Sequence, residues 1–343
     1  MTRVEKTKKT TIYDLAELTG VSASAVSAIL NGNWKKRRIS AKLAEKVTRI
    51  AEEQGYAVNR QASLLRSKKS NVIGMIVPKY DNRYFGSIAE QFEEMARARG
   101  LLPIITCTRR QPELEVEAAR AMLSWQVDWV IATGATHPDK IAQMCHQAGV
   151  PTLNLDLPGT LAPSIISDNY AGAKALTESI LASSQKRYGV LAPLTFVGGR
   201  ITDNNTAERL RGFLDAHKAH GLTVPETQQL VTGYSSARVE GLLKSVYPSP
   251  DIPLPGLFVN STISLEGVVR WLAQNGQTGS HQPPMGCFDW DPFVSLLGHD
   301  IDMVRQDVPA MLDKVFEIVD SGDTTIRRIE ISPELIASQN MAR

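Results

Sequence analysis

The chain has 343 residues, 43% hydrophobic and 22% charged, with a net charge of +2, the composition of an ordinary globular protein of two or three domains. No apolar run reaches the roughly 18 residues that a membrane-spanning helix needs, and the lysine-rich residues 1–10 precede no apolar segment of the secretory-signal type. A cytoplasmic protein with no membrane contact is therefore expected.

The charge is divided unevenly along the chain. Residues 1–70 contain 15 Lys and Arg against 6 Asp and Glu, a net +9, and the remaining residues contain 23 against 30, a net −7. A basic first part in which cations alternate with apolar residues indicates a polyanionic partner such as nucleic acid. The alternative is a lysine-rich tail that is simply solvated.

Residues 11–55 carry the pattern of three short helices around one small core. Thr11 begins a capping box, Gly20 can take the positive φ that ends a helix, and Ser22 can cap the helix after it. The predicted helices cover residues 11–19, 23–30 and 40–54. A helix, a tight turn with glycine and a second helix form the helix-turn-helix unit, whose second helix enters the major groove of DNA.

This part of the chain also contains a longer recognisable pattern, formed by residues 12–22, the pairs Val26-Ser27 and Leu30-Asn31, and Ser40, Val47, Gly55-Tyr56 and Asn59-Arg60. The pattern resembles the headpiece of the LacI/GalR family, the lactose-repressor and galactose-repressor family of transcriptional regulators. A basic insertion within residues 31–38 is similar to the fructose/sucrose-repressor branch. The resemblance implies a sequence-specific DNA-binding regulator, a repressor whose partner is double-stranded operator DNA.

The resemblance assigns the positions that contact DNA. In the family, the first residues of the second helix read base edges, and the matching residues are Ala23, Ser24 and Ala28. One serine and two alanines offer few groups for direct base readout, so we expect other contacts to add specificity; Ser24 is otherwise a solvated surface serine. The full set of predicted DNA-binding residues is Thr11, Tyr13, Ser22, Ala23, Ser24, Ser27, Ala28, Asn31, Lys35, Lys36, Arg37, Arg38, Tyr56, Asn59, Arg60, Ala62 and Leu65.

Two further segments are predicted to bind DNA. Residues 35–38 are four consecutive cations, usually a solvated face, which beside a groove-reading helix would hold phosphates and steepen the salt dependence of binding. Residues 59–66 match the family's hinge helix, which the resemblance says folds on the operator and inserts a leucine, here Leu65, into the minor groove. The alternative is that Leu64 and Leu65 pack against the body of the protein.

From residue 72 onward, apolar strands alternate with helices of 3.6-residue period. The predicted strands cover 72–78, 101–106, 127–133 and 151–156, and after a restart at Ile165 they cover 188–192, 229–231, 257–260 and 284–289. Apolar strands between amphipathic helices indicate parallel sheets covered on both faces. Two such units resemble the periplasmic-binding-protein fold. The predicted fold class is an all-α helix-turn-helix headpiece plus an α/β periplasmic-binding-protein-like core of two parallel-sheet lobes.

The predicted domain boundaries follow from these patterns. The helix-turn-helix headpiece covers residues 1–58, and the hinge helix and linker cover 59–71. The N-terminal lobe of the effector domain contains residues 72–167 and 301–323, and the C-terminal lobe contains 168–300 and 324–343.

Ligands of such sheets bind at the carboxyl ends of the strands, here between the two lobes. The predicted effector-binding residues, several of which match effector-contacting positions of the family, are Tyr84, Phe85, Asp156, Arg209, Asn260, Asp289 and Trp290. Carboxylates and an amide can bind both hydroxyls of a vicinal diol, and a guanidinium suits ring oxygens, carboxylate or phosphate. A sugar, sugar phosphate or sugar acid is predicted, with its identity and the direction of its effect left open. Asp168 resembles the family's strand-end acid, or only caps a helix.

Two other classes of protein agree less well with the sequence. A sugar-binding protein without DNA activity would share the core but lack the headpiece. An enzyme would need a catalytic motif, and the chain has no Walker loop, GxSxG, HExxH or strand-linked GxGxxG. Cys107, Cys145 and Cys287 have no metal-ligand spacing, so neither a metal nor a cofactor is expected. Family members dimerise through the core, and the end of the chain carries no leucine heptads, which favours a homodimer.

Overall fold

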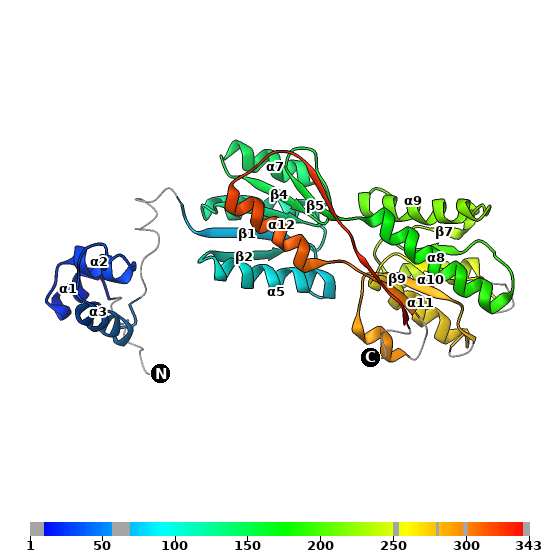
Figure 1. Cartoon of the computed structure of the whole chain (residues 1–343), viewed down its shortest axis with the longest axis horizontal. Coiled ribbons are helices and arrows are strands. Elements are labelled where there is room, and N and C mark those ends of the chain that lie inside the picture. Colours follow the sequence, from blue (N-terminus) through cyan, green and yellow to red (C-terminus); the bar gives the residue numbers. More distant parts are fainter. Residues whose placement is uncertain (1–9, 57–68, 250–253, 279–280, 298–300, 339–343) are drawn as a thin grey trace, which may run out of the picture. The chain divides into compact units, whose positions relative to one another are not determined.

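The computed structural model describes residues 10–56, 69–249, 254–278, 281–297 and 301–338. The chain forms two compact units, one up to Ser70 and one from Asn71 onward, and both are drawn in Figure 1. Within the described ranges, no helix combines the length and the apolar character that crossing a membrane requires. The first unit contains the headpiece, and the second is the two-lobed unit.

Three helices make up the headpiece: α1 (Ile12–Thr19), α2 (Ala23–Leu30) and α3 (Ala41–Glu53). The Thr11 N–H donates to the Asp14 carboxylate at 2.7 Å and the Asp14 N–H donates to Thr11 Oγ1 at 3.3 Å, which completes the capping box. Gly20 ends α1 at φ 73°, a conformation that costs other residues about 1 kcal/mol or more. The three predicted helices are confirmed to within one residue at each end.

One small hydrophobic core holds these three helices together. Its buried members are Leu15, Val26, Ile29, Ala44, Val47 and Ala51. Three of the six are only alanine or valine on α3, so the few larger side chains supply most of the buried apolar surface. The free energy of unfolding of so small a domain is low, and each large core residue contributes a considerable part of it.

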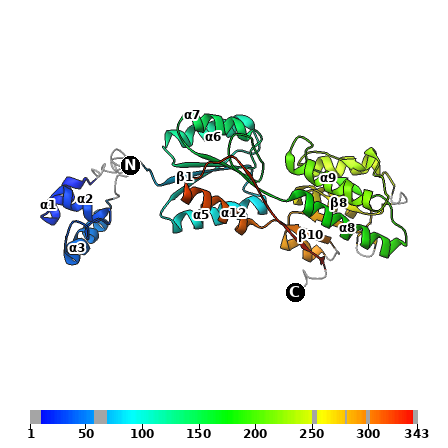
Figure 2. The same cartoon turned by 45° about the horizontal axis from the view of Figure 1, so that its top comes forward.

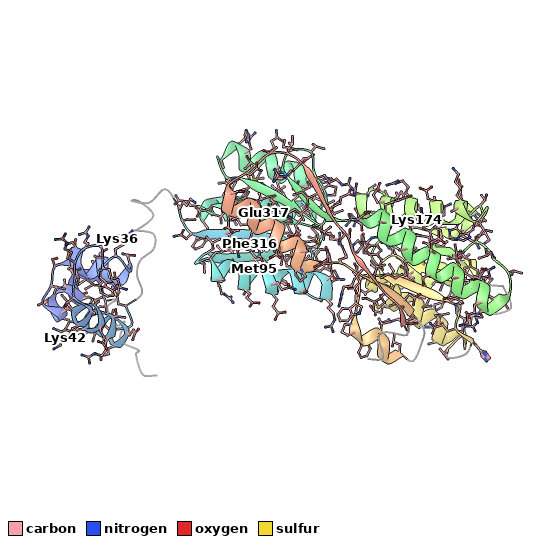
Figure 3. The ribbon with its side chains drawn as sticks, viewed as in Figure 1. Lys36, Lys42, Met95, Lys174, Phe316 and Glu317 are labelled. Carbon is pink, nitrogen blue, oxygen red and sulfur yellow. The ribbon has the colours of Figure 1, made fainter. Side chains whose placement is uncertain are left out.

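The first lobe of the two-lobed unit contains one sheet and four helices. Its elements are β1 (Val72–Val77), α5 (Arg83–Ala98), β2 (Leu102–Cys107), α6 (Pro112–Ser124), β3 (Trp129–Thr133), α7 (Pro138–Gln147), β4 (Thr152–Leu155), β5 (Ser164–Ser167), α12 (Val308–Ser321) and β11 (Arg328–Ile331). All strand pairs are parallel, in the order β11-β5-β4-β3-β1-β2. Helices α5 and α12 cover one face and α6 and α7 the other (Figure 2). Phe316 of α12 packs with Met95 of α5 (Figure 3).

The second lobe repeats this architecture. Its elements are α8 (Asn169–Tyr188), β6 (Thr195–Val197), α9 (Asn204–Ala219), β7 (Gln229–Leu230), α10 (Ser236–Val246), β8 (Leu257–Val259), α11 (Thr262–Gln274), β9 (Met285–Phe288), β10 (Ile301–Arg305) and β12 (Glu334–Ile336), with short 3₁₀ turns at Glu226–Gln228 and Pro292–Leu297. The strand order is β12-β10-β9-β8-β6-β7, and only the β10–β12 pair is antiparallel. Helices α10 and α11 pack on one face, α8 and α9 on the other. The predicted fold class is confirmed.

The predicted lobe boundaries near the end of the chain are wrong in two places. Residues 301–305, predicted in the first lobe, form β10 and pair with β9 of the second sheet. Residues 328–331, predicted in the second lobe, form β11 and pair with β5 of the first sheet. A short strand shows its own pattern in the sequence, but the distant edge that it joins is decided by tertiary packing.

Residues 188–192, which the sequence predicts as a strand of the second lobe, do not form a strand. Helix α8 continues to Tyr188 and ends at Gly189, whose φ is 76°. Val190 after it is 62% exposed, and the next strand, β6, begins at Thr195. A short apolar run cannot by itself be distinguished from a buried strand, which is why this segment was misassigned.

Candidate functional site

The polar residues predicted at strand ends lie at the carboxyl ends of both sheets. Asp156 follows β4, Asn260 follows β8 and Asp289 follows β9. Tyr84 lies in the first turn of α5, and Arg209 lies in the second turn of α9. All five are buried, with at most 9% of the residue exposed. Two come from the first lobe and three from the second, so the site is built from both lobes.

A chain of hydrogen bonds joins these residues across the lobes. Tyr84 Oη and Asn205 Nδ2 both donate to Asp156 Oδ1, each at 3.1 Å. Asn169 Nδ2 donates to Asn205 Oδ1 at 3.1 Å, and Asn169 Oδ1 accepts from Arg209 Nε at 2.7 Å. Two amide side chains therefore connect the Asp156 carboxylate of the first lobe to the Arg209 guanidinium of the second.

The Arg209 guanidinium is held on several sides. Its Nη1 donates to the backbone oxygen of Asn260 at 2.7 Å, and its central carbon lies 3.6 Å from the centroid of the Phe288 ring. With the bond from Nε to Asn169, these contacts fix a side chain that is 3% exposed. A guanidinium fixed in this way directs its remaining N–H groups toward oxygen atoms of a ligand.

Asp289 is tied to the crossover between the lobes. Gln306 Nε2 donates to Asp289 Oδ1 at 2.6 Å, and Gln306 Oε1 accepts from Ser167 Oγ at 2.5 Å. Both Asp289 and Asp156 have a left-handed backbone, with φ of 76° and 74°, which is uncommon for residues other than glycine. Strained positions of this kind concentrate at ligand sites, and here the surrounding network maintains them.

Burial changes the acidity of the site. Desolvation raises the pKa of Asp156 to about 6, although the Arg110 and Arg209 guanidinium groups oppose the increase. Burial also raises the pKa of Asp289, again opposed by Arg209. The pKa of Tyr84 lies well above its usual value because of burial and the neighbouring Asp156 carboxylate. Tyr84 is therefore protonated at neutral pH and can donate a hydrogen bond. The carboxylate of Asp156 is ionised at neutral pH and takes up a proton at its pKa of about 6.

Gly199 allows the backbone of the second lobe to approach the site closely. Its φ is 79°, and a Cβ at this position would lie 2.5 Å from both Asn260 Nδ2 and Thr206 Oγ1. Any other residue would displace these two buried side chains. The Gly198-Gly199 pair thus lets the backbone pass close to Asn260.

The sequence did not identify several residues of this site. Asn205 and Gln306 belong to the hydrogen-bond network, and the Arg110 guanidinium lies 4.4 Å from the ring centroid of Tyr234 and 5.5 Å from that of Phe85. Arg110 follows strand β2, so the strand-end rule could have found it, whereas Gln306 follows β10, a strand that the sequence analysis did not predict. Asn205 lies on the first turn of a helix, where no such rule applies.

Phe85 and Trp290 lie apart from the polar network. Phe85 is buried in the first-lobe core, with its ring centroid 5.0 Å from that of Tyr84. Trp290 is half-buried and, together with Tyr84 and Asp289, lines an open groove of about 1240 Å³. The remaining predicted effector-binding residues do not line this groove and lie deeper in the protein.

Three buried polar atoms around the site have no hydrogen-bond partner among the described residues: Asn260 Oδ1, Asp203 Oδ2 and Arg110 Nε. Buried polar atoms are normally paired, so two acceptors and one donor are available to a ligand. Hydroxyl groups both donate and accept and therefore complement such a set. Among the described residues, no group of three or more His, Cys, Asp or Glu side chains could hold a metal ion.

The headpiece exposes most of its predicted DNA-binding residues. Thr11, Tyr13, Ser22, Ser24, Asn31, Lys35, Lys36, Arg37 and Arg38 are exposed, and Ala23, Ser27 and Tyr56 are partly exposed. Ala28 is buried, with 7% of the residue exposed, and its base contact stays a prediction. Asn59, Arg60, Ala62 and Leu65 lie outside the described residues.

A helix-turn-helix headpiece followed by a two-lobed unit with a buried polar site defines a DNA-binding regulator with a ligand-sensing domain. Residues 11–59 match the model "Bacterial regulatory proteins, lacI family", and residues 73–294 match the model "Periplasmic binding protein domain". The chain belongs to the lacI family of bacterial regulatory proteins. The predicted family and DNA-binding function are confirmed, in preference to an enzyme or a sugar-binding protein without DNA activity.

Comparisons with individual proteins agree with this family assignment. The ribitol operon repressor of Klebsiella aerogenes is 84% identical over 193 residues, which are 56% of this chain and 72% of that protein. The sucrose operon repressor of Klebsiella pneumoniae is 28% identical over 303 residues, 88% of this chain and 89% of that protein. The crystal structure of the lac repressor dimer bound to operator and the anti-inducer ONPF has a TM-score of 0.80 at 20% identity, covering 97% of this chain and 99% of that chain. The last comparison supports the fold alone.

Proposed function

We propose that this chain represses an operon for the use of a short polyol, and that its effector is a linear pentitol of the ribitol type. The observation that carries the proposal is the 84% identity over 193 residues to the ribitol operon repressor of Klebsiella aerogenes, because few side chains of the aligned part differ at that identity. A repressor of this kind acts in the cytoplasm, where bacterial DNA lies. Two headpieces of a homodimer would contact the two halves of a palindromic operator.

The charges at the site favour an uncharged polyol. The carboxylates of Asp156 and Asp289 are balanced by the guanidinium groups of Arg209 and Arg110, and Asp203 is paired with Arg200 at 3.8 Å, so no excess charge calls for an ionic ligand. Each carboxylate can accept hydrogen bonds from two neighbouring hydroxyls, and Asn260 Oδ1 can accept another. A pentitol carries five hydroxyls on a short chain, which is enough to reach groups of both lobes.

The aromatic residues would cover the carbon chain of the ligand. Tyr84 on the first lobe and Trp290 at the open groove supply the apolar surface, with Phe85 packed behind Tyr84. Small-molecule sites combine such surfaces with a few convergent polar groups. We assign effector contacts to Tyr84, Asp156, Arg209, Asn260, Asp289 and Trp290, with Phe85 supporting Tyr84.

Release of the operator would follow from competition with the interlobe network. Ligand hydroxyls at Asp156 would replace the bond from Asn205, which links the two lobes, and hydroxyls at Arg209 would replace its bond to Asn169 within the second lobe. An effector shifts a conformational equilibrium only by the difference between its affinities for the two states. We propose that the pentitol binds better to the state in which the headpieces are poorly placed for DNA.

The test is a binding screen on the full chain by isothermal titration calorimetry, with ribitol, xylitol, ribose and ribitol 5-phosphate. Ribitol should bind at least about fivefold more tightly than xylitol, which differs in the configuration of one carbon, because one lost hydrogen bond at a buried site costs about 1 kcal/mol or more. Asp289→Asn should weaken ribitol binding without changing operator affinity. Binding of ribitol 5-phosphate but not ribitol, or of neither, would overturn the proposal.

Binding of the pentitol is predicted to weaken at acidic pH. The ionised Asp156 accepts ligand hydroxyls, and protonation at its pKa of about 6 removes this acceptor. The affinity should be constant above pH 7 and decrease below pH 6, approaching about tenfold per pH unit. Calorimetry on the wild type and on Asp156→Asn checks this, because the variant should bind weakly with no pH dependence between pH 5 and 8.

The same pKa shift predicts a stability change of opposite sign. The folded-state pKa of Asp156 exceeds the ordinary value of 3.8, so the folded state binds the proton more tightly than the unfolded chain. This group's contribution to the stability of the unliganded protein therefore increases as the pH falls from about 6 toward 3.8. Asp156→Asn should accordingly raise the Tm of the unliganded protein at pH 7, and a lower Tm would contradict this account.

The basic loop at residues 35–38 is predicted to account for much of the salt dependence of operator binding. All four side chains are exposed next to α2 (Lys36 is labelled in Figure 3). Each phosphate contact contributes about 0.9 to the slope of log K against log salt, so replacing all four with glutamine should reduce the slope by about 2 to 4. Arg49→Gln, which removes an exposed cation paired with Glu53 on α3, is the control. Equal slopes for the wild type and the quadruple variant would exclude phosphate contacts by this loop.

A further inference from the structure

A second pocket lies at the opposite edge of the second sheet from the polar site. Strands β6, β8 and β9 are parallel and direct their carboxyl ends toward that site, whereas this pocket is at their amino ends. It measures about 620 Å³ and is formed by the last turns of α8, the end of α11 and the segments before β8 and β9. None of the residues assigned to the effector lines it.

The walls of this pocket are largely apolar. Their apolar residues are Tyr188, Val190, Ala192, Leu254, Pro255 and Pro283. Tyr188 and Val190 are 45% and 62% exposed and lie at neighbouring positions on the rim of the pocket. Exposed apolar groups beside a hollow of this volume are a feature of ligand-binding surfaces.

Two polar atoms of the pocket lack partners among the described residues. Ser184 is 1% exposed, and its Oγ has no hydrogen-bond partner. Helical hydroxyls usually donate to the carbonyl four residues earlier, as Thr177 of the same helix does to Ala173 O at 2.7 Å. Gln277 Oε1 is also buried and unpartnered. A ligand in the pocket would therefore meet two oxygen acceptors on an otherwise apolar wall.

Arg187 is the permanently charged side chain among the described lining residues, and its surroundings offset part of that charge. No Asp or Glu is among the lining residues. Arg187 donates from Nη1 to Gln282 O, and its guanidinium carbon lies 5.5 Å from the ring centroid of Tyr188. Arg187 is in the last turn of α8, where a cation offsets the partial negative charge of a helix carboxyl end. A ligand without net charge suits these surroundings better than an anion or a cation.

We propose that this pocket is a second ligand site, which binds a small uncharged aromatic molecule carrying one hydroxyl or N–H donor, of the phenol class. The ring would pack on the apolar wall, and the donor would hydrogen bond to Ser184 Oγ. This site does not depend on the identity of the effector at the first site.

The test uses fluorine NMR on the full chain with 4-fluorophenol, and with fluorobenzene as the analogue that lacks the donor. The wild type should broaden and shift the 4-fluorophenol signal in a saturable way. Fluorobenzene should bind about five- to tenfold more weakly, since one hydrogen bond to a neutral group is lost. Excess ribitol should leave the signal unchanged. No saturable change, or displacement by ribitol, would overturn the proposal.

Two neighbouring serines of α8 provide a matched pair of variants. Ser184→Ala should reduce 4-fluorophenol affinity to that of fluorobenzene, whereas Ser183→Ala, at an exposed position, should bind like the wild type. Val190→Lys places a charge at the exposed rim, where it cannot disturb folding, and should weaken both ligands. Equal binding of 4-fluorophenol to the wild type and Ser184→Ala, or to the wild type and Val190→Lys, would assign the ligand to another place and reject the proposal.

Discussion

Replacing Arg209 with methionine is expected to reduce the affinity for the polyol effector by at least about 100-fold. The guanidinium is buried and holds Asn169 Oδ1 and the Asn260 backbone oxygen at 2.7 Å each. Its loss removes the cation that acts most strongly on the Asp289 carboxylate and, after Arg110, on the Asp156 carboxylate. A hydrogen bond from a ligand to a charged group contributes about 1.5–3 kcal/mol, and Arg209 can make more than one, whereas about 2.7 kcal/mol already corresponds to 100-fold.

Arg211→Met is the matched control for this experiment. Arg211 lies two residues further along α9, with its side chain 54% exposed and paired with Glu208. Calorimetry should show an unchanged effector affinity for this variant, and fluorescence anisotropy should show that both variants bind operator DNA as the wild type does without effector. Operator release by the polyol should fail only for Arg209→Met. If both variants respond to the effector equally, Arg209 is not part of the binding site.

Leu15→Ala is expected to abolish operator binding while leaving effector binding intact. Leu15 is fully buried in the small core of the headpiece, and a buried Leu→Ala change costs about 3 kcal/mol or more. A core with so few large members cannot replace the lost contacts, so most headpieces would be unfolded at 37 °C. The two-lobed unit is a separate compact unit and should retain its own stability.

Leu18→Ala is the matched control, which removes an exposed leucine of the same helix and not a buried one. Leu18 lies on the same helix but is 53% exposed, so its removal should change the free energy of unfolding by only about 0.5 kcal/mol. Operator affinity measured by anisotropy, with effector affinity measured by calorimetry on the same samples, distinguishes the two variants. Retention of operator binding by Leu15→Ala would show that the headpiece has a larger stability reserve than its core indicates.

The headpiece was largely predictable because its signals are local. Thr11 with Asp14 and Gly20 set the ends of α1 within a few residues, and the structure reproduces these caps. The burial of Ala28, whose base contact stays a prediction, is not visible in helix periodicity.

The polar site was predictable in its members but not in its connections. Asp156, Asn260 and Asp289 could be chosen because parallel strands bring their carboxyl ends to one edge of a sheet. The hydrogen bond from Gln306 to Asp289 could not be predicted, because it depends on the pairing of β10 with β9 beside Asp289. The bond of Asn205 to Asp156 likewise needs residues 49 positions apart and on different lobes to meet.

By itself, the sequence determined the headpiece helices, the two-lobed α/β class, the family and the strand-end residues, because caps and apolar periodicity act over a few residues. The tertiary structure alone decided which sheet receives β10 and β11 and how the amides join Asp156 to Arg209. It alone also revealed the pocket beneath Ser184. These features depend on contacts between segments far apart in the chain, and local periodicity carries no information on how such segments pack together.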